Sequence, residues 1–178
     1  MNNTAKFLAY VLRHKPSAAN VTPDEHGWVG VSALIDGVCA TGRRLNAATL
    51  AEIVATDGKQ RFSFNDDGTK IRANQGHSFP VDVQMTECEP PALLYHGTAT
   101  KYLDGIKARG ICKQTRNFVH LSKDVATAIK VGARHGEAVV LVIDARQMYL
   151  DGYKFLLSAN GVWQTECVPY RYVVETKL

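Results

Sequence analysis

Apolar residues recur at helical spacing along the N-terminal part of the chain. Leu8 and Leu12 share one face of a helix that we expect to run from an N-cap at Thr4 to about His14. Pro16 ends this helix, because the residue before a proline is pushed out of the α region. Two more helices are predicted by the same spacing, with N-caps at Ser32 and Asn46.

The pattern then changes to short segments that indicate strands. Residues 61–64 and 70–72 flank an Asn-Asp-Asp-Gly turn at 65–68, which is a strong hairpin signal. Another short strand is expected over residues 27–31. Helices followed by a hairpin favour a winged-helix arrangement, which is common in nucleic-acid binders, although a fold alone does not determine function.

Residues 79–91 separate two predicted lobes. This segment contains three prolines among mixed polar residues, so we interpret it as a linker between lobes over 1–78 and 92–178. In the second lobe the longest apolar run, 138–143, fits a buried strand. Helices are expected to end at Gly110 and to begin after Asp124. The other strands expected in this lobe cover 93–96, 119–121, 155–157, 162–164 and 170–174. The predicted fold class is therefore α+β, with a β-rich second lobe.

Composition adds only broad limits. The 178 residues are 46% hydrophobic and 21% charged, as in an ordinary globular protein. The formal net charge of +4 is compatible with RNA or another phosphate-rich partner, but many proteins carry such a charge without one. No apolar run approaches the ~20 residues of a membrane span, and no segment resembles a signal peptide. We therefore expect a cytoplasmic protein that contacts no membrane. A monomer is a separate expectation, because no sequence pattern indicates the oligomeric state.

The four cysteines do not suggest a metal site. None of them forms a C-x-x-C pair, so neither zinc nor a redox pair is supported. Free, buried thiols in a reducing compartment are the expectation. No metal is expected, because no Asp/Glu cluster is present in the sequence to hold one.

Two cationic segments lie at the edges of predicted elements. Arg13 and His14 end the first helix, where a cation either complements the helix dipole or binds a ligand. Arg72 leaves the hairpin shortly before Gly76, and it is either a solvated strand-edge charge or a second phosphate ligand. The combination of cations with breaks at Pro16 and Gly76 favours a compact phosphate site.

The second lobe carries candidate nucleotide contacts. His96-Gly97-Thr98 follows an apolar strand, where these residues either approach a ligand or form a turn into a helix. The segment 132–136 is a candidate to hold a pyrophosphate through Arg134 and backbone N–H groups such as that of Gly132. It also has the signals of an ordinary helix end, and the two interpretations are not exclusive. His120 has apolar neighbours, and taken alone it is more simply interpreted as a core histidine. Neither G-x-G-x-x-G nor a Walker motif is present, so the common nucleotide folds are unsupported.

Six motifs taken together are far more specific than any one of them. In order they are Leu-Arg-His-Lys-Pro, Arg-Ala-x-Gln-Gly-His-Ser, Leu-Tyr-His-Gly-Thr, Val-His-Leu-Ser, Val-Gly-Ala-Arg-His-Gly and Asn-Gly-Val-Trp. This series, from Lys6 to Pro169, resembles the bacterial type of the RNA 2'-phosphotransferases, which act in tRNA splicing and RNA repair. The resemblance implies a winged-helix RNA lobe followed by an ADP-ribosyltransferase-like lobe.

The resemblance also implies roles for individual residues. Those that correspond to the phosphate-handling set are Arg13, His14, Arg72 and Arg116. Those that correspond to NAD contacts are His96, Gly97, Thr98, His120 and Ser122, to which our own reading adds Gly132 and Arg134. Two departures from the pattern of relatives are Phe118 and Gln164, with the first expected to tune activity.

The implied reaction has two steps. An internal RNA 2'-phosphate attacks the nicotinamide-bearing ribose carbon of NAD, and nicotinamide leaves. The ADP-ribose 2''-hydroxyl then attacks the phosphorus, giving 2'-OH RNA and ADP-ribose 1'',2''-cyclic phosphate. Arg and His side chains stabilise the phosphate charge in the second step.

Two other functions remain open at this point. One is an ADP-ribosyltransferase that stops after the first step at a terminal phosphate of RNA or DNA. Glu166 lies near the place where many protein-modifying transferases have a catalytic Glu, although an exposed charge is the simpler interpretation. The other is a winged-helix regulator that senses NAD or ADP-ribose.

Overall fold

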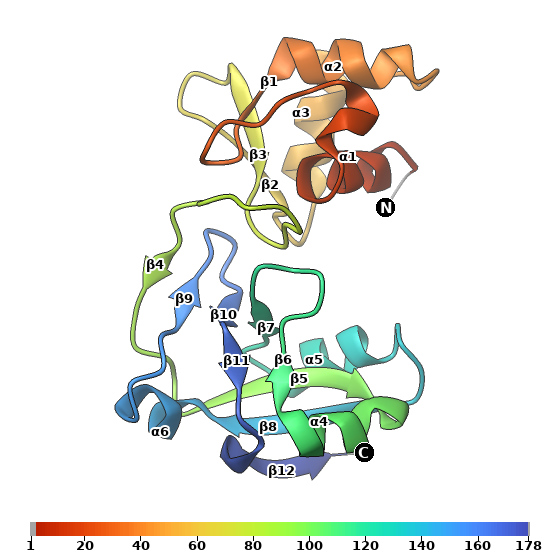
Figure 1. Cartoon of the computed structure of the whole chain (residues 1–178). Helices are drawn as coiled ribbons and strands as arrows, with labels where there is room; N and C mark the ends of the chain where they lie inside the picture. Colours follow the sequence, from red (N-terminus) through yellow and green to blue (C-terminus); the bar gives the residue numbers. More distant parts are fainter. Residues whose placement is uncertain (1–2, 178) are drawn as a thin grey trace. The chain divides into compact units, whose positions relative to one another are not determined.

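The computed structural model describes residues 3–177, and the chain divides into two compact units, Met1–Gln84 and Met85–Leu178 (Figure 1). This division falls inside the segment expected to be a linker. Part of that segment is regular structure, because Thr86–Glu87 forms strand β4 and pairs with β9 (Leu156–Leu157). We describe each unit by itself.

The first unit combines helices with a small antiparallel sheet. Its helices are α1 (Asn3–Arg13), η1 (Pro16–Ala19), α2 (Val31–Ala40) and α3 (Ala47–Thr56). Its strands, in the sheet order β1-β3-β2, are β1 (Val29–Gly30), β3 (Lys70–Ala73) and β2 (Phe62–Phe64). The expected helices and the hairpin are confirmed.

Two of the three expected N-caps in this unit are wrong. Thr4 lies inside α1, and Ser32 lies inside α2, whose N-cap is Gly30. Strand pairing sets the start of α2, because the Val31 N–H donates to the Thr69 carbonyl at 2.8 Å. Asn46 is the expected cap of α3, and its side chain accepts from the Thr49 N–H at 2.8 Å.

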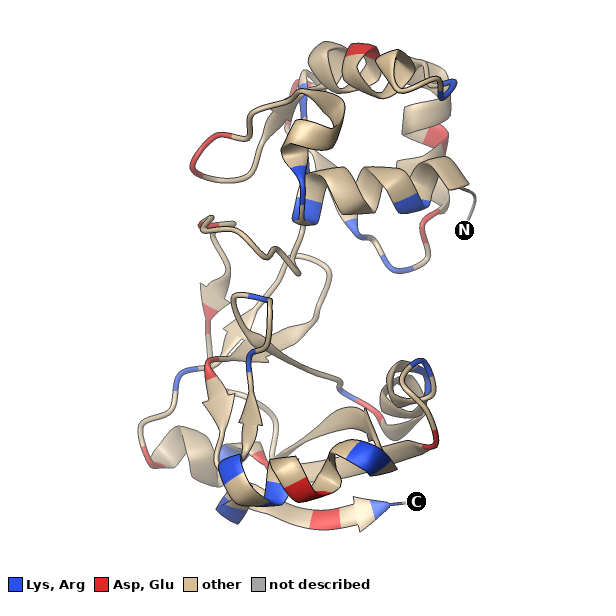
Figure 2. Cartoon of the chain, turned by 45° about the vertical axis from the view of Figure 1, so that its right-hand side comes forward, with Lys and Arg blue, Asp and Glu red and all other residues tan. Residues whose placement is uncertain are grey.

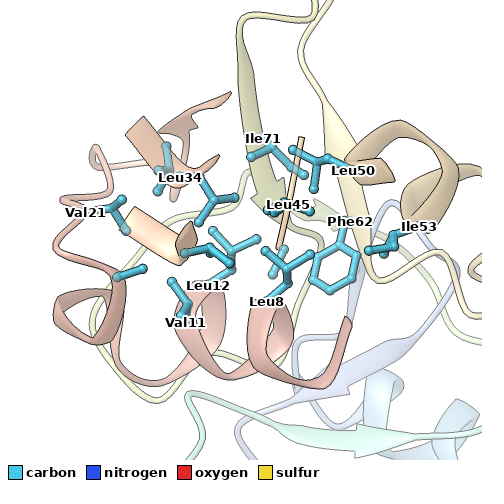
Figure 3. Packing of buried hydrophobic residues seen from close by; sticks show 14 of the residues in the cluster. Leu8, Val11, Leu12, Val21, Leu34, Leu45, Leu50, Ile53, Phe62 and Ile71 are labelled. Atoms are coloured by element: carbon cyan, nitrogen blue, oxygen red, sulfur yellow. The ribbon is translucent and has the colours of Figure 1, made fainter. Parts of the chain in front are cut away.

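Packing in the first unit fixes where its cations lie. Leu8 and Leu12 of α1 are buried with Ile71 of β3 in one apolar cluster (Figure 3). Burial of each such side chain contributes about 1.5–3 kcal/mol. Arg13 directly follows Leu12, and Arg72 directly follows Ile71, so both cations are attached to rigid backbone. Since neighbouring residues of a strand face opposite sides, Arg72 points away from this core.

The second unit is richer in strands. In chain order its elements begin with β4, β5 (Leu93–Ala99), η2 (Thr100–Tyr102), α4 (Leu103–Arg109), β6 (Ile111–Cys112), β7 (Val119–Leu121) and α5 (Val125–Gly132). They continue with β8 (Ala138–Asp144), α6 (Ala145–Leu150), β9, β10 (Trp163–Thr165), β11 (Cys167–Val168), η3 (Tyr170–Tyr172) and β12 (Val173–Lys177). The sheets have the strand orders β4-β9-β10-β7, β12-β8-β5 and β11-β6.

Several expectations for this unit are confirmed and others need correction. The buried strand β8, the Asp124 cap of α5 and the Gly110 end of α4 are confirmed. Helix α6 is an additional element, capped by Asp144. His96, Gly97 and Thr98 lie within β5 rather than after it.

The expectation of buried thiols is wrong. All four cysteines are free, but Cys39 and Cys112 are exposed and Cys88 and Cys167 are half-buried. Within residues 3–177, no helix combines the length and the apolar character needed to cross a membrane.

Candidate functional site

The end of α1 is tied to the segment that follows β3. The Ser78 N–H donates to the carbonyl of Arg13 at 2.9 Å, and the Ser78 hydroxyl contacts Nδ1 of His14 at 3.0 Å. In the segment that follows β3, Gly76 has a φ of 89°. A Cβ on this residue would lie 3.7 Å from the guanidinium carbon of Arg13. The two cationic segments expected from the sequence therefore meet in the first unit, whose basic residues on α1 are blue in Figure 2.

The Arg72 guanidinium is held by several groups at once. Its carbon lies 4.3 Å from the ring centroid of Trp28, and its Nη1 donates to the His26 carbonyl at 3.2 Å and to the Gln84 amide oxygen at 3.4 Å. Its Nε is buried and has no hydrogen-bond partner among the described residues. Burial lowers the pKa of Arg72 from its ordinary value, while Asp24 and Asp82 act in the opposite direction. The side chain is thus a cation, partly desolvated, with a donor left for an acceptor.

His77 lies among these cations. It is 2% exposed, and its ring meets Phe79 edge-on with centroids 5.3 Å apart. Burial, together with the positive charges of Arg13, His14 and Arg72, lowers the pKa of His77 to about 4. The imidazole is therefore neutral near pH 7. We call Arg13, His14, Arg72 and His77 the phosphate cluster.

The second unit brings two histidines together across adjoining strands. Tyr95 and Ser122 exchange backbone hydrogen bonds of 3.0 and 2.7 Å, which sets β5 beside β7. In this register the Nδ1–H of His96 donates to the His120 carbonyl at 3.2 Å. Burial lowers the pKa of His96, the His120 carbonyl opposes this effect, and His135 adds to it. His96 is therefore neutral, and its Nε2 is a hydrogen-bond acceptor.

Arg116 joins the same group. Its Nη1 donates to Nδ1 of His120 at 2.5 Å, so Nε2 of that ring carries the proton when the imidazole is neutral. Burial and the nearby charge of Arg134 lower the pKa of Arg116, which nevertheless remains a cation at neutral pH. Two guanidinium groups near a pair of histidines form a region suited to an anionic nucleotide.

The glycines of this region have a packing explanation. A Cβ on Gly97 would lie 1.8 Å from the Ala128 carbonyl oxygen, and one on Gly132 would lie 2.4 Å from the Thr98 carbonyl oxygen. Helix α5 therefore lies directly against the backbone of β5. Contacts of Gly97, Thr98 and Gly132 with a ligand stay a prediction.

The expected phosphate-handling residues are thus distributed over both units. Arg13, His14 and Arg72 gather in the first, and Arg116 lies in the second. Within the described residues, no group of three or more His, Cys, Asp or Glu side chains is arranged to hold a metal ion.

Phe118 and Gln164, the two positions that depart from the pattern of relatives, differ in burial, as does Glu166. Gln164 is 1% exposed, lies opposite His120 in the pairing of β10 with β7, and donates to Sδ of Met85 at 3.0 Å. Phe118 is half-buried, and Glu166 is exposed, as the simpler interpretation of that charge expected.

Sequence reasoning missed two residues of the first unit. His77 stands in the Arg-Ala-x-Gln-Gly-His-Ser motif, which was signal enough to include it. Trp28 follows a glycine at the start of a short strand, and no pattern in the sequence places its ring beside Arg72.

Comparison with known proteins identifies close relatives. Residues 1–167 match the family described as RNA 2'-phosphotransferase, Tpt1 / KptA family. A probable RNA 2'-phosphotransferase of Pseudomonas aeruginosa PAO1 is 47% identical over 176 residues, covering 98% of this chain and 97% of that protein. A protein of the same name from Agrobacterium fabrum C58 is 47% identical over 170 residues, covering 96% and 91%. Another from Fusobacterium nucleatum is 45% identical over 177 residues, covering 97% and 99%.

Proposed function

Because the chain belongs to the RNA 2'-phosphotransferase, Tpt1 / KptA family, we propose that it removes an internal 2'-phosphate from RNA with NAD as co-substrate. The proposed products are 2'-OH RNA, nicotinamide and ADP-ribose 1'',2''-cyclic phosphate. The observation that carries the proposal is the state of Arg72, a stacked and partly desolvated cation whose buried Nε has no partner among the described residues.

The phosphate cluster fits the RNA phosphate. A phosphomonoester has two negative charges and three terminal oxygens that accept hydrogen bonds, whereas a diester or a hydroxyl offers fewer acceptors and less charge. Arg13, His14 and Arg72 supply the donors. The Ser78 hydroxyl oxygen, 3.0 Å from Nδ1 of His14, fixes the orientation of that ring. Selectivity for the monoester follows from this difference in charge and geometry.

The residues of the second unit fit the co-substrate. NAD supplies a ribose carbon bearing a good leaving group, and the chain's own part is to bind and orient it. The neutral His96 offers an acceptor at Nε2 for a hydroxyl or amide N–H, and Arg116 and Arg134 offer positive charge for a pyrophosphate. We assign the cofactor contacts to His96, Gly97, Thr98, His120, Ser122, Gly132 and Arg134.

The two steps make different demands on the chain. In the first, the RNA phosphate oxygen bonds to the ribose carbon as the bond to nicotinamide breaks, and the phosphate's own charge removes the need for a strong base. In the second, the ribose hydroxyl attacks phosphorus and the RNA 2'-oxygen leaves, so negative charge builds on the phosphate oxygens. We assign stabilisation of that charge to Arg13, His14, Arg72 and Arg116.

The finer fold assignments are part of the same proposal. Three α-helices with the hairpin β2–β3 support a winged-helix first unit, and the strand-rich second unit supports an ADP-ribosyltransferase-like fold. A monomeric state and a place in the cytoplasm are also proposed.

The test is incubation of the protein with a 2'-phosphorylated oligonucleotide, with and without NAD, and analysis of the products by mass. We expect NAD-dependent loss of the phosphate and release of nicotinamide, with no reaction of the matching 2'-OH oligonucleotide. A stable ADP-ribosylated RNA would instead indicate a transferase that stops after the first step. Unchanged RNA with bound NAD would indicate a sensor.

A further inference from the structure

The indole of Trp28 lies against a residue that the proposed function needs. The pairs Val29↔Ile71 and Gly30↔Lys70 set the register of β1 with β3, and continuing this register by one residue places Trp28 opposite Arg72. The Arg72 guanidinium carbon lies 4.3 Å from the ring centroid. A planar cation at this distance is attracted by the face of the indole and is restrained in its tilt.

Trp28 is itself fixed by a compact turn. The Trp28 N–H donates to Oδ1 of Asp24 at 2.9 Å, and the Asp24 N–H donates to the Trp28 carbonyl at 3.0 Å. Lys70 donates to the other oxygen of Asp24 at 3.1 Å. Gly27 has a φ of 80°, and a Cβ there would lie 3.2 Å from Val81. These bonds fix the backbone of Trp28 in the ligand-free protein.

The other contacts of Arg72 leave one edge of its guanidinium group available to a ligand. Nη1 is engaged by the carbonyl of His26 and the amide oxygen of Gln84. Nε and Nη2 form the opposite edge, the one that binds two oxygens of an anion side by side, and the buried Nε has no partner among the described residues. The stack on Trp28 and the bonds at Nη1 together set the direction of this edge.

We infer that Trp28 is a positioning residue, which orients the Nε–Nη2 edge of Arg72 toward the RNA 2'-phosphate and so contributes to selectivity for that group. This inference rests on the proposed function. Trp28 acts through Arg72 and needs no contact of its own with the RNA.

The experiment compares three variants by titration with a 2'-phosphorylated oligonucleotide and its 2'-OH counterpart. Trp28→Leu removes the aromatic face, Trp28→Phe keeps one, and Phe7→Leu is the matched control, because Phe7 lies 3.7 Å from the guanidinium carbon of Arg43 in the same unit. We expect Trp28→Leu to lower the ratio of the two affinities by about 5- to 30-fold. Trp28→Phe should keep most of the wild-type affinity ratio, and Phe7→Leu should leave the ratio unchanged.

A double-mutant cycle separates positioning from a general structural role. In an Arg72→Ala background, Trp28→Leu is expected to change the affinity ratio by less than about twofold, because the group it orients is gone. An equal effect of Trp28→Leu with and without Arg72, or an equal effect of Phe7→Leu, overturns the inference.

A spectroscopic measurement keeps this result distinct from failure of the proposed function. If the wild-type protein does not distinguish the two oligonucleotides, the proposed function is overturned. The placement of Trp28 is then read from the Arg72 Nε–H proton resonance, assigned by its loss in Arg72→Lys. We expect an upfield ring-current shift that Trp28→Leu removes and Trp28→Phe partly keeps. An unshifted wild-type resonance overturns the placement, even where Trp28→Leu fails to fold.

Discussion

The Nδ1 proton of His96 is held by the backbone carbonyl of His120, 3.2 Å away on the neighbouring strand. This bond fixes both the ring orientation and the tautomer of a half-buried histidine. It leaves Nε2 as the acceptor that the proposed co-substrate site uses.

His96→Ala is therefore expected to weaken the use of NAD without removing RNA binding. The variant loses an acceptor in the second unit, while the phosphate cluster in the first unit is unchanged. Steady-state rates at varied NAD and direct titration with 2'-phosphorylated RNA are the measurements. An equal loss of RNA affinity contradicts this assignment of roles.

Arg72→Ala is expected to make ADP-ribosylated RNA accumulate. Phosphate charge is greatest in the second step, and loss of one such donor costs about 2–4 kcal/mol of transition-state stabilisation. The second step should therefore slow by about 30- to 1000-fold, as followed by rapid quench. Arg43→Ala is the control, because Arg43 stacks on Phe7 outside the phosphate cluster. A wild-type rate in Arg72→Ala, with no intermediate detected, rules out this role.

Binding is expected to depend on the 2'-phosphate and little on base sequence. In the proposed function the phosphate cluster binds a monoester through charge-assisted bonds, and the net charge of +4 argues against a long electrostatic contact. The salt dependence of binding should accordingly be shallow, corresponding to a few neutralised phosphates. Competition among oligonucleotides that differ in sequence or in the 2'-phosphate, repeated at several salt concentrations, provides the test. Strong preference for one sequence supports the regulator instead.

His77 is expected to make the first unit less stable in mild acid. Its pKa is about 4 in the folded protein and 6.5 in an unfolded chain, so between these values the unfolded state binds a proton that the folded state does not. The free energy of unfolding should fall as the pH is lowered from 6.5 to about 4, by roughly 3 kcal/mol from this residue.

Denaturant unfolding of the wild type and of His77→Gln across this pH range is the measurement. Gln does not titrate, so the free energy of unfolding of His77→Gln should fall less over this pH range. The difference from the wild type should equal the contribution expected of His77. Identical pH dependence in the two proteins means that His77 is not buried as a neutral base.

The sequence predicts the parts of this molecule that local rules determine. Asn46 and Asp124 cap helices where expected, because each cap bonds to a backbone N–H only three residues away. The prediction of Ser32 as an N-cap is wrong because the start of α2 depends on a hydrogen bond from the Val31 N–H to the carbonyl of Thr69, which lies far along the chain. Helix α6 is too short for its periodicity to be recognised.

The same distinction applies to the candidate site. Arg13 and Arg72 could be selected from the sequence because cations beside helix and strand ends are visible in it. The contact of Arg72 with Trp28 and the shift of the His77 pKa could not, because both depend on tertiary packing among separate segments.

The close contact of α5 with β5 determines which side of the strand a ligand can occupy. At Gly97 the helix backbone approaches so closely that even a methyl group has no space, so no ligand can enter between the two elements. Adjacent residues of a strand face opposite sides, and His96 is therefore turned away from α5. The part of a ligand that contacts the His96 ring therefore lies on the other face of β5. Helix α5 backs the strand on this side, so the backbone that carries His96 cannot shift toward the helix.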